Sequence, residues 1–254
     1  MRVASLYDIH GNLPALEAVL ADVGRSRVDK VVVGGDVASG PLPAQTVEAL
    51  LALGDRAWFV RGNADREVVE AYDAGRVDAA AESEPARRAA VFAAAALSRD
   101  QRDFLAGFSD TVTVNLEGLG ETLFCHGSPR DDDEIITAAT PPQRLRRILT
   151  GVRQRVVVCG HTHQQFDRRL DSYRVINAGS VGVPYEGRAG AYWALLGPGV
   201  ELRRTEYELE PALARLRGGG FPDLEEMVGE SLLDPVDPAW VADFFEGQAE
   251  GRSR

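Results

Sequence analysis

The sequence predicts an α/β protein with two β-sheets, and three observations support this fold class. Short apolar runs alternate with amphipathic segments over the first 60 residues, in the β-α-β-α-β order typical of a sheet covered by helices. Further strand-like runs follow one another between residues 155 and 209, which predicts a second, mostly antiparallel sheet. Apolar residues make up 44% of the 254 positions, which is enough for a large core.

The first elements have clear local support. Leu13, Leu16, Leu20 and Val23 fall on one face of a helix, and Asn12 is a suitable residue to cap its first turn. The β-branched run "KVVVGG" is typical of a fully buried strand. We predict strands over 2–7, 30–35 and 57–60, with helices over 13–23 and 44–53.

The remaining elements follow from the same patterns. Residues 65–105 are rich in Ala, Glu and Arg and predict helices broken near Gly75 and Pro85. A helix is predicted over 141–150, and strands over 111–116, 121–126, 155–159, 165–170, 173–178, 191–196 and 200–209. We expect a domain over 1–209, with 65–105 as a helical insertion near its functional site. A helical C-terminal extension follows over 210–254, with residues 247–254 frayed.

Charge and composition exclude several kinds of partner. The net charge is −11 and the sequence has no dense run of Lys or Arg, which argues against binding a long nucleic acid or an anionic membrane. No apolar run is long enough to cross a bilayer, and the N-terminus does not read as a signal peptide. Cys125 and Cys159 do not make a disulfide framework, so we expect two packed thiols and a cytoplasmic protein. No oligomeric state is predicted.

Polar side chains follow five of the predicted strands. These residues are Asp8 and His10, Asp36, Asn63, His126, and His161 with His163, and they include all four histidines of the chain. Because functional crevices of α/β sheets lie at the carboxyl ends of the strands, we expect the seven side chains to converge on one edge. Asp8 and His10, like His161 and His163, are two residues apart, a spacing that places both side chains on one side of extended backbone. Imidazole, carboxylate and amide ligands together favour Mn, Fe, Co, Ni or Zn over Ca or Mg.

The order of these segments resembles the calcineurin-like metallophosphoesterases. The similarity rests on "DIHGN" (8–12), "GD" (35–36), "GN" (62–63), "HGSPRD" (126–131) and "GHTH" (160–163). "INAGSVGVP" (176–184) is similar to a further segment of the small prokaryotic phosphodiesterase branch. The resemblance covers about the first 200 residues.

The resemblance implies two packed mixed β-sheets flanked by helices, a four-layer sandwich with two divalent transition-metal ions. Asp8, His10, Asp36 and His163 are implied to hold one ion. Asp36, Asn63, His126 and His161 are implied to hold the second, with Asp36 bridging. Mn is the expected metal, with Fe, Ni, Co and Zn as alternatives. The implied activity is hydrolysis of a small phosphodiester or phosphomonoester. A dinucleoside polyphosphate hydrolase and a non-catalytic binding scaffold on the same fold are the alternatives.

The sequence departs from part of this family at the position after Asn63. Protein phosphatases carry a histidine there that helps to protonate the leaving oxygen, and this chain has Ala64. Asp65 and the "DDDE" segment (131–134) are the candidates for a replacement acid, although a solvated loop is the preferred interpretation of 131–134. The arginine of the protein phosphatase segment "GDxVDR" is also absent, which argues against a phosphoprotein substrate. Arg61 and Arg130 are candidates for contact with phosphate, and ordinary surface arginine is the simpler interpretation of each.

Overall fold

Ten strands build two sheets in the computed structural model, which describes residues 1–252. The strands are β1 (Val3–Leu6), β2 (Lys30–Val33), β3 (Ala57–Phe59), β4 (Thr111–Leu116), β5 (Gly120–Cys125), β6 (Val156–Cys159), β7 (Phe166–Leu170), β8 (Tyr173–Asn177), β9 (Ala191–Leu196) and β10 (Val200–Thr205). The first sheet has the order β10-β9-β1-β2-β3 and the second the order β4-β5-β6-β8-β7. The predicted strands are all present, with ends that differ by a few residues.

Helices account for most of the remaining chain. They are α1 (Leu13–Arg25), α2 (Pro43–Leu51), α3 (Asn63–Asp73), α4 (Pro85–Ala96), α5 (Arg99–Ala106), α6 (Pro142–Ile148), α7 (Leu209–Arg217), α8 (Leu224–Val228) and α9 (Pro238–Arg252). Short 3₁₀ turns η1 (Gly54–Arg56) and η2 (Ala79–Ala81) and a π-helical turn η3 (Gly229–Leu233) complete the set. Asn12 caps α1 as predicted, because its side chain accepts the backbone N–H of Ala15 at 3.2 Å.

Both sheets are mixed, which corrects one prediction. Strands β1, β2 and β3 are parallel, and β9 and β10 extend the same sheet in antiparallel pairing. In the second sheet, β5, β6 and β8 are parallel, with antiparallel β4 and β7 at the edges. The prediction that residues 155–209 form a mostly antiparallel second sheet is therefore wrong, because β9 and β10 return to pair beside β1.

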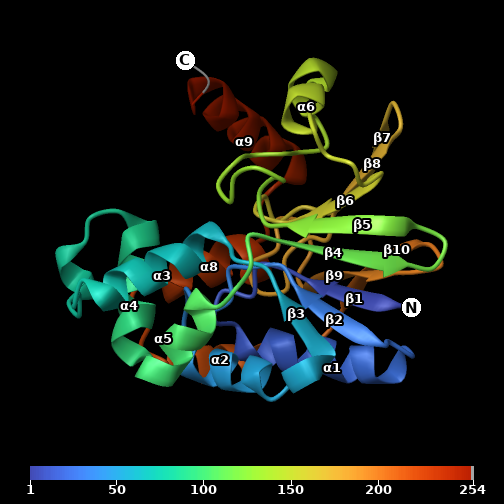
Figure 1. The fold of residues 1–254 in the computed structure, drawn as a ribbon. Coiled ribbons are helices and arrows are strands. Elements are labelled where there is room, and N and C mark those ends of the chain that lie inside the picture. The colour runs from blue at the N-terminus through green and yellow to red at the C-terminus, as the bar shows by residue number, and fades with distance from the viewer. Residues whose placement is uncertain (253–254) are drawn as a thin grey trace.

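Three apolar interfaces hold four layers together (Figure 1). Leu16, Val19 and other buried residues of α1 and α2 pack beneath the first sheet. Tyr7, Phe124 and Val158 belong to the core between the two sheets. Leu145 and Ile148 of α6 cover the outer face of the second sheet. This arrangement confirms the predicted fold of two mixed sheets flanked by helices.

The last forty-odd residues are helical and partly share the main core. Leu216, Leu224 and Val228 pack in the same cluster as α1 and the first sheet. The final helix α9 lies beside α6 (Figure 1), where Glu246 accepts hydrogen bonds from Thr137 and Thr140. It continues to Arg252, so residues 247–252 are helical where the sequence predicts a frayed end, and positions 253–254 lie outside the described residues. The division of the chain at residue 209 stays a prediction.

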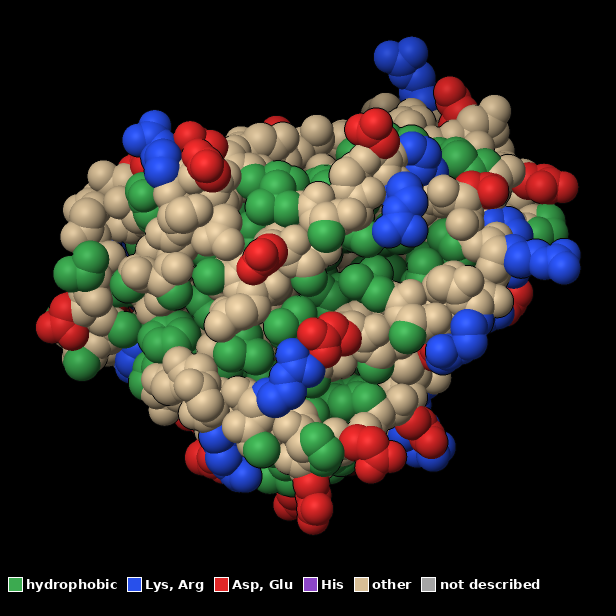
Figure 2. All heavy atoms as spheres, turned by 90° about the horizontal axis from the view of Figure 1, so that it is seen from below, with side chains coloured by type: hydrophobic (Ala, Val, Ile, Leu, Met, Phe, Trp, Pro, Cys, Tyr) green, Lys and Arg blue, Asp and Glu red, His purple; other side chains and the backbone are tan. Residues whose placement is uncertain are grey.

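The surface shows no large basic region on the face that Figure 2 presents. Acidic and basic side chains are interspersed there around apolar ones. Within residues 1–252, no helix combines the length and the apolar character that a membrane span requires.

Candidate metal centre

The seven candidate residues follow strands of both sheets. Asp8 and His10 follow β1, Asp36 follows β2, and Asn63 begins α3 after β3. His126 follows β5, and His161 and His163 follow β6. The expectation that a single sheet edge gathers them is therefore wrong. The carboxyl ends of β1, β2 and β3 in one sheet and of β5 and β6 in the other meet at the same place.

The backbone of these residues is not extended. Left-handed conformations occur at five of them, with φ of 52° at Asp8, 46° at His10, 55° at Asp36, 66° at His161 and 56° at His163. Each such residue costs on the order of 1 kcal/mol or more, because its Cβ crowds the backbone. The prediction that an extended backbone places the side chains of residues i and i+2 on one side is therefore wrong. Strained loops, rather than strand alternation, turn the side chains inward.

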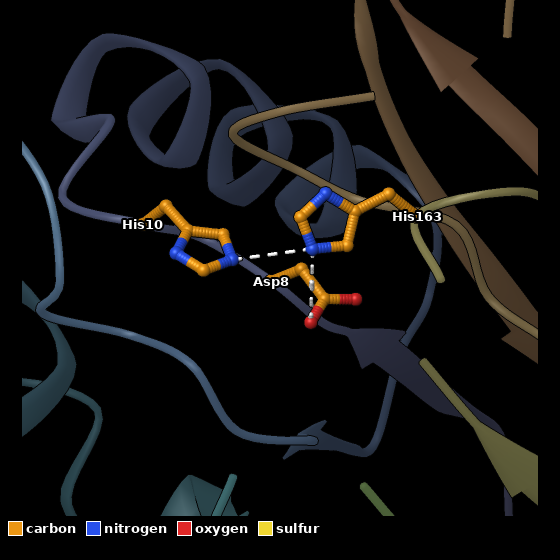
Figure 3. A group of neighbouring side chains, drawn as sticks. All are labelled: Asp8, His10 and His163. Carbon is orange, nitrogen blue, oxygen red and sulfur yellow. Dashed lines mark hydrogen bonds and ion pairs between the residues drawn. The ribbon is translucent and has the colours of Figure 1, made fainter. Parts of the chain in front are cut away.

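Asp8, His10 and His163 form the first group (Figure 3). The two imidazole rings point toward one another, with 3.2 Å between their Nε2 atoms. The Oδ1 atom of Asp8 lies 3.6 Å from Nε2 of His163. This oxygen is buried and has no hydrogen-bond partner among the described residues.

The hydrogen bonds of the two rings decide which nitrogens carry hydrogen. Nδ1 of His10 lies 3.1 Å from the carbonyl oxygen of Ser39, and Nδ1 of His163 lies 2.7 Å from that of Val183. A carbonyl oxygen only accepts, so Nδ1 is the N–H of each ring and each Nε2 carries a lone pair. Burial lowers the pKa of both histidines, which keeps both rings neutral. Two lone pairs and a carboxylate oxygen therefore converge, an arrangement that a cation stabilises.

Asp36, His126 and His161 form the second group. Nε2 of His126 lies 3.3 Å from Oδ2 of Asp36 and is buried without a hydrogen-bond partner. Burial lowers the pKa of His126, but the carboxylates of Asp36 and Asp8 outweigh burial and raise it to about 10. The pocket thus stabilises positive charge at this point.

Asp36 lies between the two groups. Its Oδ1 accepts the backbone N–H of Ala64 at 2.8 Å, which directs Oδ2 toward the histidines. Oδ2 is 3.3 Å from Nε2 of His126 and 3.8 Å from Nε2 of His10. The buried amide oxygen of Asn63 also has no hydrogen-bond partner in the described chain, and Asn63 lines the same cavity as Asp36. These imidazole, carboxylate and amide donors suit divalent metal ions, and Asp36 approaches histidines of both groups.

The segment 176–184 holds the loops in place. Asn177 donates to the carbonyl of Gly160 at 2.7 Å, and Ser180 donates to the carbonyl of Asp8 at 2.7 Å. Asn12 in turn donates to the carbonyl of Gly182 at 2.9 Å. The segment similar to a prokaryotic family motif therefore ties the loop after β1 to the loop after β6.

Asp65 has a different position from the one predicted. Its carboxylate is buried and accepts three backbone N–H groups, those of Asp36, Val37 and Gly62, each at 2.9 Å. Both oxygens are used in holding the loop of Asp36, so the expectation that Asp65 acts as a replacement acid is wrong. The sequence gives no direct sign of this role, because the partners are backbone groups.

The segment 131–134 is more ordered than the preferred interpretation of a solvated loop. Asp132 binds Arg66 through two bonds of 3.0 and 3.1 Å, and Glu134 pairs with Arg130. Oδ1 of Asp133 lies 3.5 Å from Nε2 of His161, so one carboxylate of the segment reaches the site. The guanidinium of Arg61 pairs with Asp110 at 2.6 Å. Arg61 and Arg130 also line a cavity together with His126, so their contact with phosphate stays a prediction. Cys125 and Cys159 are buried free thiols, as predicted.

A cavity of about 270 Å³ opens beside the first group. Helices α3, α4 and α8 contribute to its wall, so the insertion and the C-terminal segment both border the site. Tyr185 also lines it and stacks on His163, with ring centroids 5.1 Å apart. Sequence reasoning did not identify Tyr185, Glu67, Glu226 or Glu230, and only the place of Tyr185 directly after the segment 176–184 offered a signal.

The chain is similar to known proteins over most of its length. The chain is 24% identical over 256 residues to an uncharacterized protein of Methanocaldococcus jannaschii, covering 91% of this chain and 97% of the relative. A crystal structure of a metallophosphoesterase from Sphaerobacter thermophilus is 26% identical, covers 91% of this chain and 99% of its own, and superposes with a TM-score of 0.72. A hypothetical protein of Pyrococcus horikoshii, 22% identical with coverage of 91% and 97%, shares the fold with a TM-score of 0.78. The model of the calcineurin-like phosphoesterase superfamily domain matches residues 1–196, and the chain belongs to this superfamily.

Proposed function

We propose that this protein is a hydrolase that cleaves a small phosphodiester or phosphomonoester at a pair of divalent metal ions. Asp8, His10, Asp36 and His163 would hold one ion, and Asp36, Asn63, His126 and His161 the other. The observation that carries the proposal is the pair of Nε2 lone pairs, 3.2 Å apart, beside the unpartnered oxygen of Asp8. No arrangement of hydrogens on neutral rings satisfies these three atoms together, and a cation does.

The bound ions supply an activated water near neutral pH and stabilise charge on the phosphoryl oxygens. The contribution of the chain is to hold its ligands without rearrangement. The carbonyls of Ser39 and Val183 fix the rings of His10 and His163, and the N–H of Ala64 fixes the carboxylate of Asp36. The two aspartates carry two negative charges, so a pair of divalent ions leaves a local charge of about +2 that attracts phosphate to an acidic protein.

The side chain of Ala64 bears on the choice of leaving group. It lines the cavity where part of the superfamily carries an acidic histidine, and a methyl group donates no proton. We therefore propose that the preferred esters have leaving groups that depart without protonation. Manganese is the metal we propose, because the ligands combine imidazole nitrogen with carboxylate and amide oxygen.

The test is hydrolysis of bis-p-nitrophenyl phosphate by the purified protein with Mn²⁺, together with metal analysis. Asp36→Asn should lower kcat by roughly a thousandfold, since it removes the charge shared by both groups. Asp171→Asn is the matched control, because Asp171 also has a positive φ of 53° but pairs with Arg146 on the surface. A wild-type rate in Asp36→Asn refutes the proposal. Two bound ions without any phosphoesterase activity would instead identify a binding scaffold.

A further inference from the structure

The cavity beside the candidate metal centre has an acidic wall. Glu67 of α3, Glu226 of α8 and Glu230 of η3 line it, and none of its described lining residues is a lysine or an arginine. A fourth carboxylate, Asp223, is neutralised by Arg88, whose Nε lies 2.7 Å away. Glu67, Glu226 and Glu230 have no ion pair in the part of the chain that the structure describes. Arg66 and Arg88 act on Glu67 and Glu226 only beyond ion-pair distance, so the wall beyond the candidate metal ligands carries a net negative charge.

Glu67 is the one of the three carboxylates that lies on the same helix as a candidate ligand, Asn63. It is half-buried on the first turns of α3, one turn after Asn63. Burial, followed by the neighbouring carboxylate of Asp36, raises the pKa of Glu67. A negative charge there is held against an unfavourable environment, and a cation in the cavity would relieve it.

The remaining surface of the cavity is apolar. Pro85, Ala86 and Ala89 of α4 line it together with Phe221 and Met227, and Tyr185, which stacks on His163, lines it too. Aromatic faces and apolar groups next to carboxylates are the usual surroundings of alkylated ammonium groups, which combine charge with an apolar surface. A volume of about 270 Å³ lies below the range of pockets that hold drug-sized ligands and suits a small group of this kind.

We propose that the substrates are phosphoesters whose organic part carries an amine or a quaternary ammonium, and that Glu67, Glu226 and Glu230 select them. The inference rests on the proposed function, because the metal pair must hold the phosphate for the organic group to enter this cavity. It disfavours dinucleoside polyphosphates, whose additional phosphates would face the three carboxylates. The carboxylates take no part in the reaction and act on the choice of ester.

Two esters that differ only in charge test the inference. One is the choline ester of p-nitrophenyl phosphate, and the other is its 3,3-dimethylbutyl ester, in which carbon replaces nitrogen. In both, a water oxygen forms the new bond to phosphorus, the bond to p-nitrophenolate breaks, and an alkyl phosphate and a proton are released. We expect kcat/KM to be at least about tenfold higher for the choline ester, which corresponds to about 1.4 kcal/mol.

Variants then locate the selectivity. Glu226→Gln with Glu230→Gln should lower the ratio of the two kcat/KM values several-fold, mainly through a higher KM of the choline ester, with Glu67 retaining the rest of the selectivity. Glu225→Gln is the matched control, because Glu225 lies on the same helix, pairs with Arg217 and does not line the cavity. Its ratio should equal that of the wild type. An equal loss for both esters in the double variant would indicate a structural role and overturn the inference.

The outcomes separate the two proposals. Equal hydrolysis of both esters by the wild type overturns the selection of cations and leaves the phosphoesterase standing. Hydrolysis of neither ester, nor of bis-p-nitrophenyl phosphate, overturns the proposed function and the inference with it. A readout without catalysis is titration calorimetry of the Mn²⁺-loaded protein with two phosphonates whose P–C bond is not an ester, 2-(trimethylammonio)ethylphosphonate and 3,3-dimethylbutylphosphonate. We expect the cationic phosphonate to bind several-fold more tightly, and equal affinities would contradict the inference.

Discussion

Asp65→Ala should destabilise the protein through the loop that carries Asp36. The substitution removes the acceptor of three buried backbone N–H groups, those of Asp36, Val37 and Gly62. A buried donor left without a partner costs about 1–3 kcal/mol, so the gross loss is roughly 3–6 kcal/mol once some water enters. Burial, and next Asp36, raise the pKa of Asp65 to about 7, so the carboxylate is itself costly to bury and its removal returns part of this energy. We expect a net loss of about 2–4 kcal/mol.

Urea denaturation followed by circular dichroism measures this loss. Asp29→Ala is the control, because Asp29 accepts a single exposed N–H, that of Arg2, and its removal should cost less than about 1 kcal/mol. The loss of stability in Asp65→Asn should lie between those of Asp65→Ala and Asp29→Ala, because the amide oxygen still accepts a hydrogen bond while the NH₂ group faces other donors. Unfolding of Asp65→Ala at the same urea midpoint as the wild type, with an unchanged m value, would refute the assignment of Asp65 as the support of this loop.

Three further results are expected. Gly62→Ala places a Cβ 2.1 Å from Oδ1 of Asp36 and should reduce metal content and activity at least tenfold. In the control Gly24→Ala the Cβ meets nothing within 4 Å, so the thermal midpoint should rise slightly. Normal metal content in Gly62→Ala would contradict the geometry. Ala64→His should increase hydrolysis of alkyl phosphodiesters relative to p-nitrophenyl esters by tenfold or more, as a proton donor is added, and an unchanged ratio in steady-state assays would show that the position does not face the leaving group. Mn²⁺ at a free concentration of a hundred times Kd should raise the free energy of unfolding by about 2.7 kcal/mol per ion, measured by differential scanning calorimetry. Asp36→Asn should lose most of this gain in the same measurement.

The sequence predicts the strands and helices well because their apolar periodicity is local. It does not predict that β9 and β10 pair beside β1, because this pairing joins residues about 190 positions apart and leaves no local pattern. The continuous apolar run over residues 191–196 is compatible with either sheet. Long-range register, rather than propensity, decides between them.

The candidate site likewise has a part that the sequence predicts and a part that it does not. The seven side chains are found because all four histidines follow strand-like runs, as Asp8, Asp36 and Asn63 also do, in an order that resembles a known family. The left-handed backbone of Asp8 and His163 and the carbonyls that orient the rings are not found, because any residue supplies a carbonyl and non-glycine residues rarely indicate a positive φ. The sequence draws attention to Asp65 but not to its structural role, because its hydrogen-bond partners are backbone groups.

The candidate ligands come from loops of both sheets, and this arrangement affects how the protein would begin to unfold. A cation held by Asp8 and His163, or by Asp36 and His126, would join two halves of the molecule whose strands never pair with each other. Such an ion would cross-link the loops of the two sheets, and separation of the sheets would release it. Disruption of the interface between the two sheets would therefore release the metal before either sheet unfolds.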